Sequence, residues 1–189
     1  MQENKPILII GLGNPGRQYE QTRHNAGFMA ADFLAGPAAV WKKEKNALVT
    51  KMTPAGSQTI LIAKPQTYMN DSGIAVRDLM AFYKIPLENL IVIHDDMDLP
   101  IGTMRQKVGG GSAGHNGIKS IDANVGNGYM RIRLGIGHPP SPMLQGTSPQ
   151  AAAETHPQGI VIDPSDWVLG RFSADDLKKI NEVIRNLSV

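Results

Sequence analysis

The stretch ILIIGLGNPG at residues 7–16 opens with four aliphatic residues and continues into three glycines and a proline. A short apolar run that ends in turn residues predicts a buried β-strand, here over residues 7–12. Five further runs, bounded by glycine, proline, asparagine or aspartate, predict strands at residues 47–52, 59–63, 90–94, 104–108 and 129–136. We expect most of these strands to lie in one sheet.

Segments with helical periodicity lie between and after these strands. Apolar residues recur at i, i+3, i+4 and i+7 in four segments, at residues 26–33, 76–83, 118–125 and 180–187. Residues 54–57, PAGS, separate two strands and predict a hairpin turn, so that at least this pair is antiparallel. The pattern predicts one α/β domain over residues 1–189, a sandwich in which helices cover both faces of a mixed, twisted sheet.

The composition fits one globular domain and limits its chemistry. A chain of 189 residues with 41% hydrophobic and 19% charged residues can bury a sizeable core. The absence of cysteine excludes disulfides and thiolate nucleophiles and is typical of the reducing cytoplasm, where we expect the protein. No run of about 18 apolar residues is present, so we expect no membrane segment.

Charge is distributed unevenly along the chain. A net charge of +2 is too small for binding nucleic acid through bulk charge, so any polyanion site must be local. Residues 88–98 hold four carboxylates and no base, whereas residues 105–133 hold five basic residues and one carboxylate. Arg131 and Arg133 lie two apart on a predicted strand, so we expect both to meet a polyanion on one side. The cluster of lysines at residues 42–45 is typical of solvated surface.

Residues 138–166 differ in composition from the rest of the chain. Six prolines occur from Pro139 to Pro164, both included, and no lysine or arginine occurs from residue 139 to residue 170. We expect this segment to be a long Pro-rich loop within the single domain.

Residues 11–16, GLGNPG, satisfy the G-x-G-x-x-G pattern of dinucleotide-binding folds. The following residues 17–23 are polar where a phosphate-binding helix would need apolar residues, and Pro15 lacks an amide hydrogen. We therefore expect a sharp turn at a strand end that leaves Asn14 exposed over the sheet edge. Asn14 could also be an ordinary turn residue.

Residues 110–114, GGSAG, spell the G-x-S-x-G pattern of serine hydrolases. Three glycines precede Ser112, and the helical period begins only near Asn116, which argues against a nucleophile elbow at Ser112. A glycine-rich loop before a helix is equally suited to binding an anion, and Asn116 could cap that helix or act in a site. Candidate partners for Ser112 as a nucleophile are Asp122, Asp163, His138 and His156.

Residues 94–98, HDDMD, follow a buried strand, at the end of the sheet where α/β proteins usually place their sites. These residues could bind Mg²⁺ or form a solvated acidic turn. Because side chains alternate along a strand, they cannot all converge on one ion while the strand continues. In a third interpretation, Asp95 alone points into a cleft and orients His24, at the start of the first predicted helix.

Several motifs occur in an order that resembles bacterial-type peptidyl-tRNA hydrolase. The resemblance is dense over residues 6–139 and resumes at DWVLGRF, residues 166–172. It is carried by GLGNPG at residues 11–16, TRHNAGF at 22–28, KPQTYMNDSG at 64–73, HDDMDLPIG at 94–102, KVGGGSAGHNGIKSI at 107–121 and YMRIRLGIGHP at 129–139.

The resemblance implies hydrolysis of the ester bond between a peptide and tRNA, which recycles tRNA from aborted translation. By matching positions, it implies that His24 is the general base that activates water and that Asp95 orients its imidazole. It implies no cofactor and no metal. An ester can be cleaved by water with a base of near-neutral pKa and a dipole for the oxyanion.

The same resemblance assigns substrate contacts. It implies that Asn14 is an active-site amide that helps to distinguish peptidyl-tRNA from aminoacyl-tRNA. It implies that the amides of Asn70 and Asn116 grip the substrate and that the rings of Tyr19 and Tyr68 contact the acceptor end. It also implies that Lys107 and Arg133 clamp a tRNA phosphate. From the residues alone, Tyr19 and Tyr68 could equally be core.

The resemblance implies peptidyl-tRNA as the partner of a monomeric protein. A non-catalytic tRNA-binding module and a serine esterase that uses Ser112 remain the alternative functions.

Overall fold

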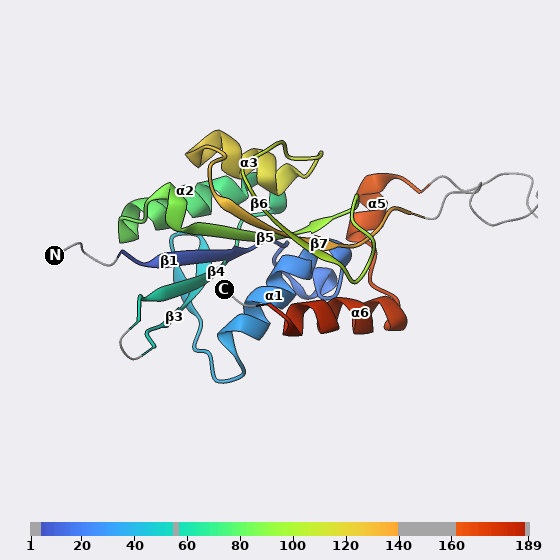
Figure 1. The fold of residues 1–189 in the computed structure, drawn as a ribbon, viewed down its shortest axis with the longest axis horizontal. Helices are drawn as coiled ribbons and strands as arrows, with labels where there is room; N and C mark the ends of the chain where they lie inside the picture. Colours follow the sequence, from blue (N-terminus) through green and yellow to red (C-terminus); the bar gives the residue numbers. More distant parts are fainter. Residues whose placement is uncertain (1–4, 55–56, 140–161, 188–189) are drawn as a thin grey trace, which may run out of the picture.

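The structure, a computed structural model, describes residues 5–54, 57–139 and 162–187. Within these residues, seven strands form one sheet in the order β2-β3-β4-β1-β5-β7-β6 (Figure 1). The strands are β1 (Ile7–Gly11), β2 (Lys42–Glu44), β3 (Ala47–Met52), β4 (Ile60–Pro65), β5 (Leu90–Asp96), β6 (Met104–Val108) and β7 (Met130–Gly135). The α/β fold with a single main sheet confirms the predicted fold class.

The sheet is mixed, as the predicted hairpin required. At its centre, β1 pairs in parallel with both β4 and β5, and β5 pairs in parallel with β7. Strands β3 and β4 are antiparallel, with Met52 opposite Ile60, and β2 and β6 are also antiparallel to their neighbours. Residues 55–56 of the predicted turn lie outside the described residues, but the antiparallel pairing that the turn predicted is confirmed.

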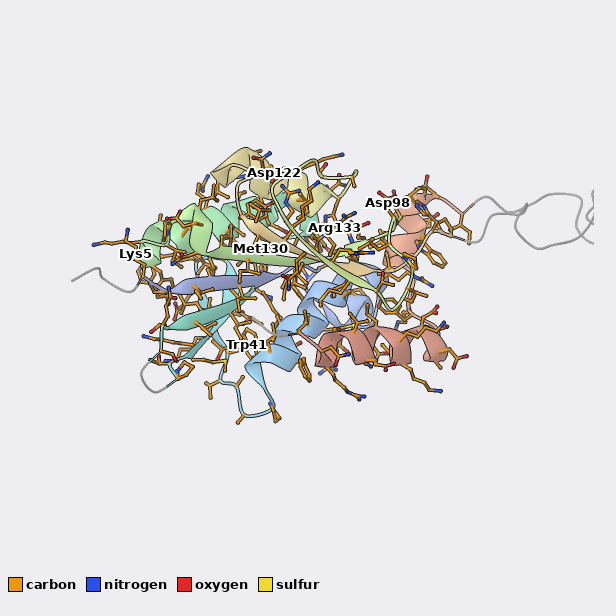
Figure 2. All side chains as sticks on the ribbon, viewed as in Figure 1. Lys5, Trp41, Asp98, Asp122, Met130 and Arg133 are labelled. Atoms are coloured by element: carbon orange, nitrogen blue, oxygen red, sulfur yellow. The ribbon has the colours of Figure 1, made fainter. Side chains whose placement is uncertain are left out.

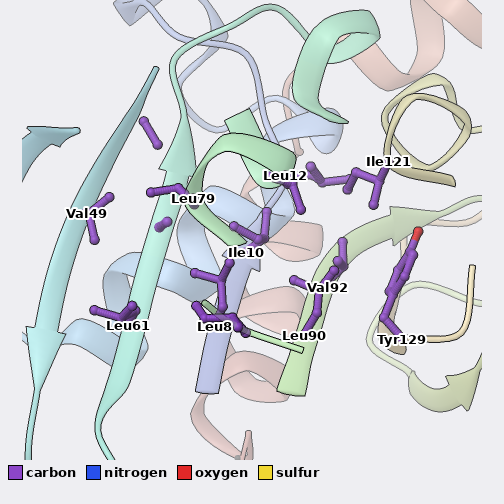
Figure 3. Packing of buried hydrophobic residues seen from close by; sticks show 14 of the residues in the cluster. Leu8, Ile10, Leu12, Val49, Leu61, Leu79, Leu90, Val92, Ile121 and Tyr129 are labelled. Carbon is purple, nitrogen blue, oxygen red and sulfur yellow. The ribbon is translucent and has the colours of Figure 1, made fainter. Parts of the chain in front are cut away.

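Helices cover both faces of the sheet, as predicted (Figure 1). The helices α2 (Ser72–Tyr83) and α3 (Asn116–Val125) cover one face, and α1 (Ala26–Ala35) and α6 (Ala174–Arg185) cover the other. Side chains alternate accordingly along the central strands, because neighbours in a strand face opposite sides. The core under α2 and α3, drawn in Figure 3, contains Leu8, Ile10, Leu90, Val92, Leu79 and Ile121. The core under α1 and α6 contains Ile9, Ile93, Ala30, Ala31, Ile180 and Ile184.

The short strand β2 and the short helix α5 (Pro164–Leu169) were not predicted. The three-residue strand β2 lies where the lysine cluster was interpreted as ordinary surface, and its polar sequence carries no strand pattern. The helix α5 begins within the range expected to be a loop. Its start is explained locally, because the Asp163 side chain accepts a hydrogen bond from Ser165 N–H and Pro164 occupies the first turn. Of the expected loop, residues 140–161 lie outside the described residues.

The first glycine of GLGNPG allows α1 to pack directly on β1. A Cβ atom at Gly11 would lie 2.2 Å from the carbonyl oxygen of Gly27, and a Cβ at Gly27 would lie 2.4 Å from the carbonyl oxygen of Ile93. Only glycines permit so close a contact between helix and sheet. This contact brings the residues just before α1 to the carboxyl end of β5.

The carboxyl ends of the parallel strands lie at the same end of the sheet, and the connections that follow them form the site described below. In Figure 2, Asp98 lies at this end of the molecule and Lys5 at the opposite end. Within the described residues, no helix combines the length and the apolar character needed to cross a membrane.

Candidate active site

The structure brings His24 and Asp95 into direct contact. His24 lies in a 3₁₀ turn, η2 (Arg23–Asn25), that leads into α1, and Asp95 lies near the end of β5. The Nδ1 atom of His24 is 3.0 Å from each carboxylate oxygen of Asp95, and both side chains are buried. Asp95 reaches His24 because it faces the same side of the sheet as Ile93, the side that α1 covers. The pairing of His24 with Asp95 that the third interpretation and the family resemblance predicted is therefore present.

A second imidazole contacts the same carboxylate. The Nε2 atom of His115 lies 3.0 Å from Oδ1 of Asp95, and the Nδ1 atom of His115 accepts a hydrogen bond from Ile118 N–H at 3.4 Å. Because Nδ1 accepts, we assign the proton of the His115 ring to Nε2, which donates to Asp95. His115 was not predicted as a site residue. It is also the cap of α3, so the interpretation of Asn116 as the cap was wrong.

The charge of Asp95 controls the protonation of His24. Burial acts to lower the pKa of His24, but the negative charge of Asp95 and its hydrogen bond outweigh burial, so the pKa lies above its usual value. Burial acts to raise the pKa of Asp95, yet the two imidazoles hold it well below its usual range. Asp95 is therefore ionised, and His24 donates Nδ1–H to it. The Nε2 atom of His24 remains as the basic nitrogen.

Asn14 is held with its amide in a fixed orientation. Its backbone N–H donates to Oδ1 of Asn25 at 2.8 Å, and Nδ2 of Asn25 donates back to the Asn14 carbonyl at 3.0 Å. Oδ1 of Asn14 accepts from Met69 N–H at 2.9 Å, and its Nδ2 group donates to none of the residues that the structure describes. Asn14 is only 7% exposed, so the expectation that it stands exposed over the sheet edge was wrong. Asn25, which fixes it, was not predicted.

These side chains surround one pocket of about 410 Å³. Asn14, His24 and Asp95 line it, and so do four other predicted contact residues, namely Tyr19, Tyr68, Asn70 and Asn116. The rings of Tyr19 and Tyr68 pack edge to face, with centroids 6.4 Å apart, and Tyr68 is 59% exposed. Both tyrosines therefore lie at the pocket and not in the core, which answers the question that the sequence left open.

The predicted phosphate pair lies outside the pocket wall, on β6 and β7. Lys107 is exposed on β6, and Arg133 on β7 donates from Nε to Asp96. The pairing of these strands places Lys107 opposite Arg131, so Lys107, Arg131 and Arg133 share one face of the sheet. Arg131 is 2% exposed, because it is bound to Asp122. The expectation that Arg131 meets a polyanion together with Arg133 was therefore wrong.

The serine-nucleophile arrangement is not assembled. Ser112 lines the pocket, but within the described residues its hydroxyl makes no hydrogen bond to a histidine. Of its candidate partners, Asp122 accepts from Tyr129 and Arg131, and His138 contacts Asp98. Asp163 caps α5, and His156 lies outside the described residues.

The residues at 94–98 do not converge on one point. The Nδ1 atom of His94 contacts the carbonyl oxygen of Asp95, and Asp96 binds Arg133. Among the residues that the structure describes, His24, Asp95 and His115 are the three groups close enough to share a metal ion, with ligand atoms within 4.8 Å of one another. The Nδ1 atom of His24 and the Nε2 atom of His115 already make hydrogen bonds to the carboxylate of Asp95. Hydrogen bonding accounts for this cluster without an ion.

Comparison with known proteins gives one consistent family. The family model described as Peptidyl-tRNA hydrolase matches residues 8–188. The peptidyl-tRNA hydrolase of Aliarcobacter butzleri is 41% identical over 179 residues, which cover 95% of this chain and 86% of that protein. That of Bartonella bacilliformis is 44% identical over 180 residues, which cover 94% of this chain and 83% of that protein. A crystal structure of the Acinetobacter baumannii enzyme matches with a TM-score of 0.78 and 33% identity, covering 98% of this chain and 85% of that one.

Proposed function

Because the chain belongs to the peptidyl-tRNA hydrolase family and hydrolyses peptidyl-tRNA, we propose that it cleaves the ester with a water molecule activated by His24. The observation that carries this proposal is the contact of His24 Nδ1 with both oxygens of Asp95 at the pocket wall. The contact leaves Nε2 of His24 as the one basic ring nitrogen and supplies a fixed negative charge behind it.

The reaction proceeds by direct attack of water. Nε2 of His24 takes a proton from the water as its oxygen bonds to the ester carbonyl carbon, and Asp95 stabilises the imidazolium that forms. When the tetrahedral intermediate collapses, the bond from carbon to the ribose 3′ oxygen breaks. The imidazolium returns its proton to that oxygen, which gives tRNA with a free 3′ hydroxyl. The peptide leaves as a carboxylic acid, which releases its proton to solvent and becomes a carboxylate.

The orientation of Asn14 suits it to bind a peptide carbonyl. Its Oδ1 is occupied by Met69 N–H, so it offers the substrate N–H groups. Such donors pair with a carbonyl oxygen of the peptide or with the developing oxyanion. The ammonium group of aminoacyl-tRNA is also a donor and cannot pair with the Nδ2–H group of Asn14, which supports the discrimination assigned to Asn14.

The remaining pocket residues suit the acceptor end of tRNA. Tyr19 and Tyr68 present a partly exposed aromatic pair on which an unpaired base can stack. Asn70 and Asn116 are exposed amides in the same pocket that can bind the substrate's polar groups.

We assign a tRNA phosphate to Lys107 and Arg133 on the face beside the pocket. Lys107 has the larger share, because Asp96 already neutralises much of the charge of Arg133. All assigned residues come from one chain, so a monomer suffices, and we place its action in the cytoplasm, where peptidyl-tRNA arises.

The test compares binding with turnover for wild type and Ser112→Ala, using N-acetyl-aminoacyl-tRNA. We expect both proteins to bind and hydrolyse the substrate, and neither to be labelled by a fluorophosphonate. Binding without turnover would identify a tRNA-binding module instead. Loss of turnover in folded Ser112→Ala, with labelling of the wild type, would identify a serine esterase.

A further inference from the structure

Arg23, the residue before His24, is a buried cation that the hydrolytic mechanism does not use. It is 8% exposed, and within residues 5–54, 57–139 and 162–187 no carboxylate lies within ion-pair distance of its guanidinium. Instead, its Cζ atom lies 3.5 Å from the centroid of the Trp167 ring, and its Nη1 donates to the Trp167 carbonyl at 3.2 Å. Burying a guanidinium is costly unless hydrogen bonds and stacking replace its lost hydration, and Trp167 supplies both for Arg23.

The backbone around Arg23 is paired with the segment that follows α5. Arg23 N–H donates to the Gly170 carbonyl at 3.0 Å, Phe172 N–H donates to the Gln21 carbonyl at 3.0 Å, and Thr22 forms a β-bridge with Arg171. Gly170 also leaves room for the guanidinium, since a Cβ atom there would lie 2.8 Å from Nη1 of Arg23. The turn that carries His24 and the end of α5 therefore form one unit.

The helix α5 is a wall of the pocket, and it is too short to hold its own position. Pro164, Ser165, Val168 and Leu169 line the same pocket as His24. The helix α5 lies at the carboxyl end of the sheet (Figure 1). An isolated helix of six residues is unstable in water, so the placement of α5 depends on its contacts. Two of these contacts are made by Trp167, which stacks on Arg23 and donates from Nε1 to the Gly137 carbonyl at 2.7 Å.

We propose that Arg23 is a positioning residue that, through Trp167, holds α5 in place as the pocket wall beside His24. The proposal rests on this pocket being the place where peptidyl-tRNA is cleaved, but not on the role of His24 as the base. Arg23 does not act as a substrate contact, because Trp167 covers its guanidinium and its side chain does not line the pocket.

The test uses steady-state kinetics of Arg23→Met, Trp167→Leu and the double variant. A displaced wall weakens substrate placement, so we expect kcat/KM to fall roughly ten- to a hundredfold, mainly through KM. The double variant falls no further than the worse single variant, because both remove one contact. Arg23→Lys recovers part of the loss, since an ammonium can still lie over the indole. Arg77→Met, which removes a half-exposed arginine on α2, serves as the matched control with unchanged kinetics.

A spectroscopic reading separates positioning from general destabilisation. The chain has two tryptophans, so Trp41→Phe leaves Trp167 as the only one. In this background we expect Arg23→Met to change the emission and the quencher accessibility of Trp167 while the protein remains folded. If Arg23→Met does not fold, Arg23→Lys in the same background carries the same comparison.

Three results would overturn the proposal. They are an unchanged kcat/KM in folded Arg23→Met, additive losses in the double variant, and a shift of the pH midpoint of kcat, which would mean that Arg23 acts on His24 by charge. All variants keep His24, so a failure of the water-activation mechanism would leave this test readable.

Discussion

The Nδ1 atom of His24 lies 3.0 Å from both carboxylate oxygens of Asp95, a residue 71 positions later in the chain. This contact determines which ring nitrogen is basic and holds the ring against the pocket wall. It depends on the close packing of α1 on β1 and on the direction in which Asp95 leaves β5. The contact accounts for the expected pH dependence of hydrolysis, and the neighbouring contacts account for the remaining predictions.

Hydrolysis should require His24 to be neutral. Asp95 raises the pKa of His24, so the acid limb of kcat should have its midpoint above the usual histidine pKa. Asp95→Asn removes the charge that opposes burial, so the pKa of His24 should fall and the limb should move to lower pH. The plateau rate should drop by about 10²–10⁴ because the imidazolium loses its counter-charge. The measurement is the pH–rate profile of both proteins, with Asp175→Asn on α6 as a control. A limb that stays in place would contradict this role of Asp95.

His115→Ala should reduce both stability and activity. The substitution removes the cap of α3, which should lower the free energy of unfolding by about 0.5–2 kcal/mol. It also removes one hydrogen-bond donor to Asp95, which should slow hydrolysis roughly tenfold. Ser173→Ala is the matched control, because it removes the cap of α6 away from the pocket. It should lose similar stability, measured by urea denaturation, and no activity. Equal activities of the two variants would remove His115 from the site.

Asn14→Asp should impair selection more than folding. The substitution keeps the acceptor for Met69 N–H but replaces the N–H donors with a negatively charged oxygen that attracts an ammonium group. We expect hydrolysis of N-acetyl-aminoacyl-tRNA to fall about 10²-fold and the preference over free aminoacyl-tRNA to shrink. Asn181→Asp on α6 adds the same charge and should change neither rate. An undiminished preference in Asn14→Asp would rule out the assigned donor role.

Neutralising Lys107 and Arg133 should flatten the salt dependence of tRNA binding. If each contacts one phosphate, Lys107→Ala with Arg133→Gln should reduce the slope of log K against log salt by about 1.4–1.8. Glutamine at position 133 retains a donor for Asp96, which is buried. Lys178→Ala, on the opposite side of the sheet, should leave the slope unchanged. An unaltered slope in the double variant would exclude these two residues from the tRNA interface.

Most of the fold could be predicted because apolar periodicity reports directly on burial. The six predicted strands and four predicted helices correspond to elements of the structure. The strand β2 could not be predicted because its residues Lys42–Glu44 pair at the sheet edge without burying an apolar face. The helix α5 carries local start signals in Asp163 and Pro164, but its six residues are too few to show a helical period.

The site was predictable where it depends on one strand and one helix start. Strand alternation placed Asp95 on one face of the sheet, and the family resemblance paired it with His24. The roles of His115 and Asn25 could not be predicted, because each depends on a partner that only folding brings near. His115 contacts Asp95, and Asn25 contacts Asn14. Alternation also placed Arg131 on the correct face, but it could not reveal that Asp122 on α3 covers it.

The most direct measurement of the central claim is the single-turnover rate of N-acetyl-aminoacyl-tRNA hydrolysis by His24→Ala beside wild type, at saturating enzyme. We predict that the variant keeps its fold and its tRNA binding, while hydrolysis slows by at least about 10² because no group takes the proton from water. A folded variant that hydrolyses within about tenfold of the wild-type rate would contradict the mechanism, since a general base contributes more than that.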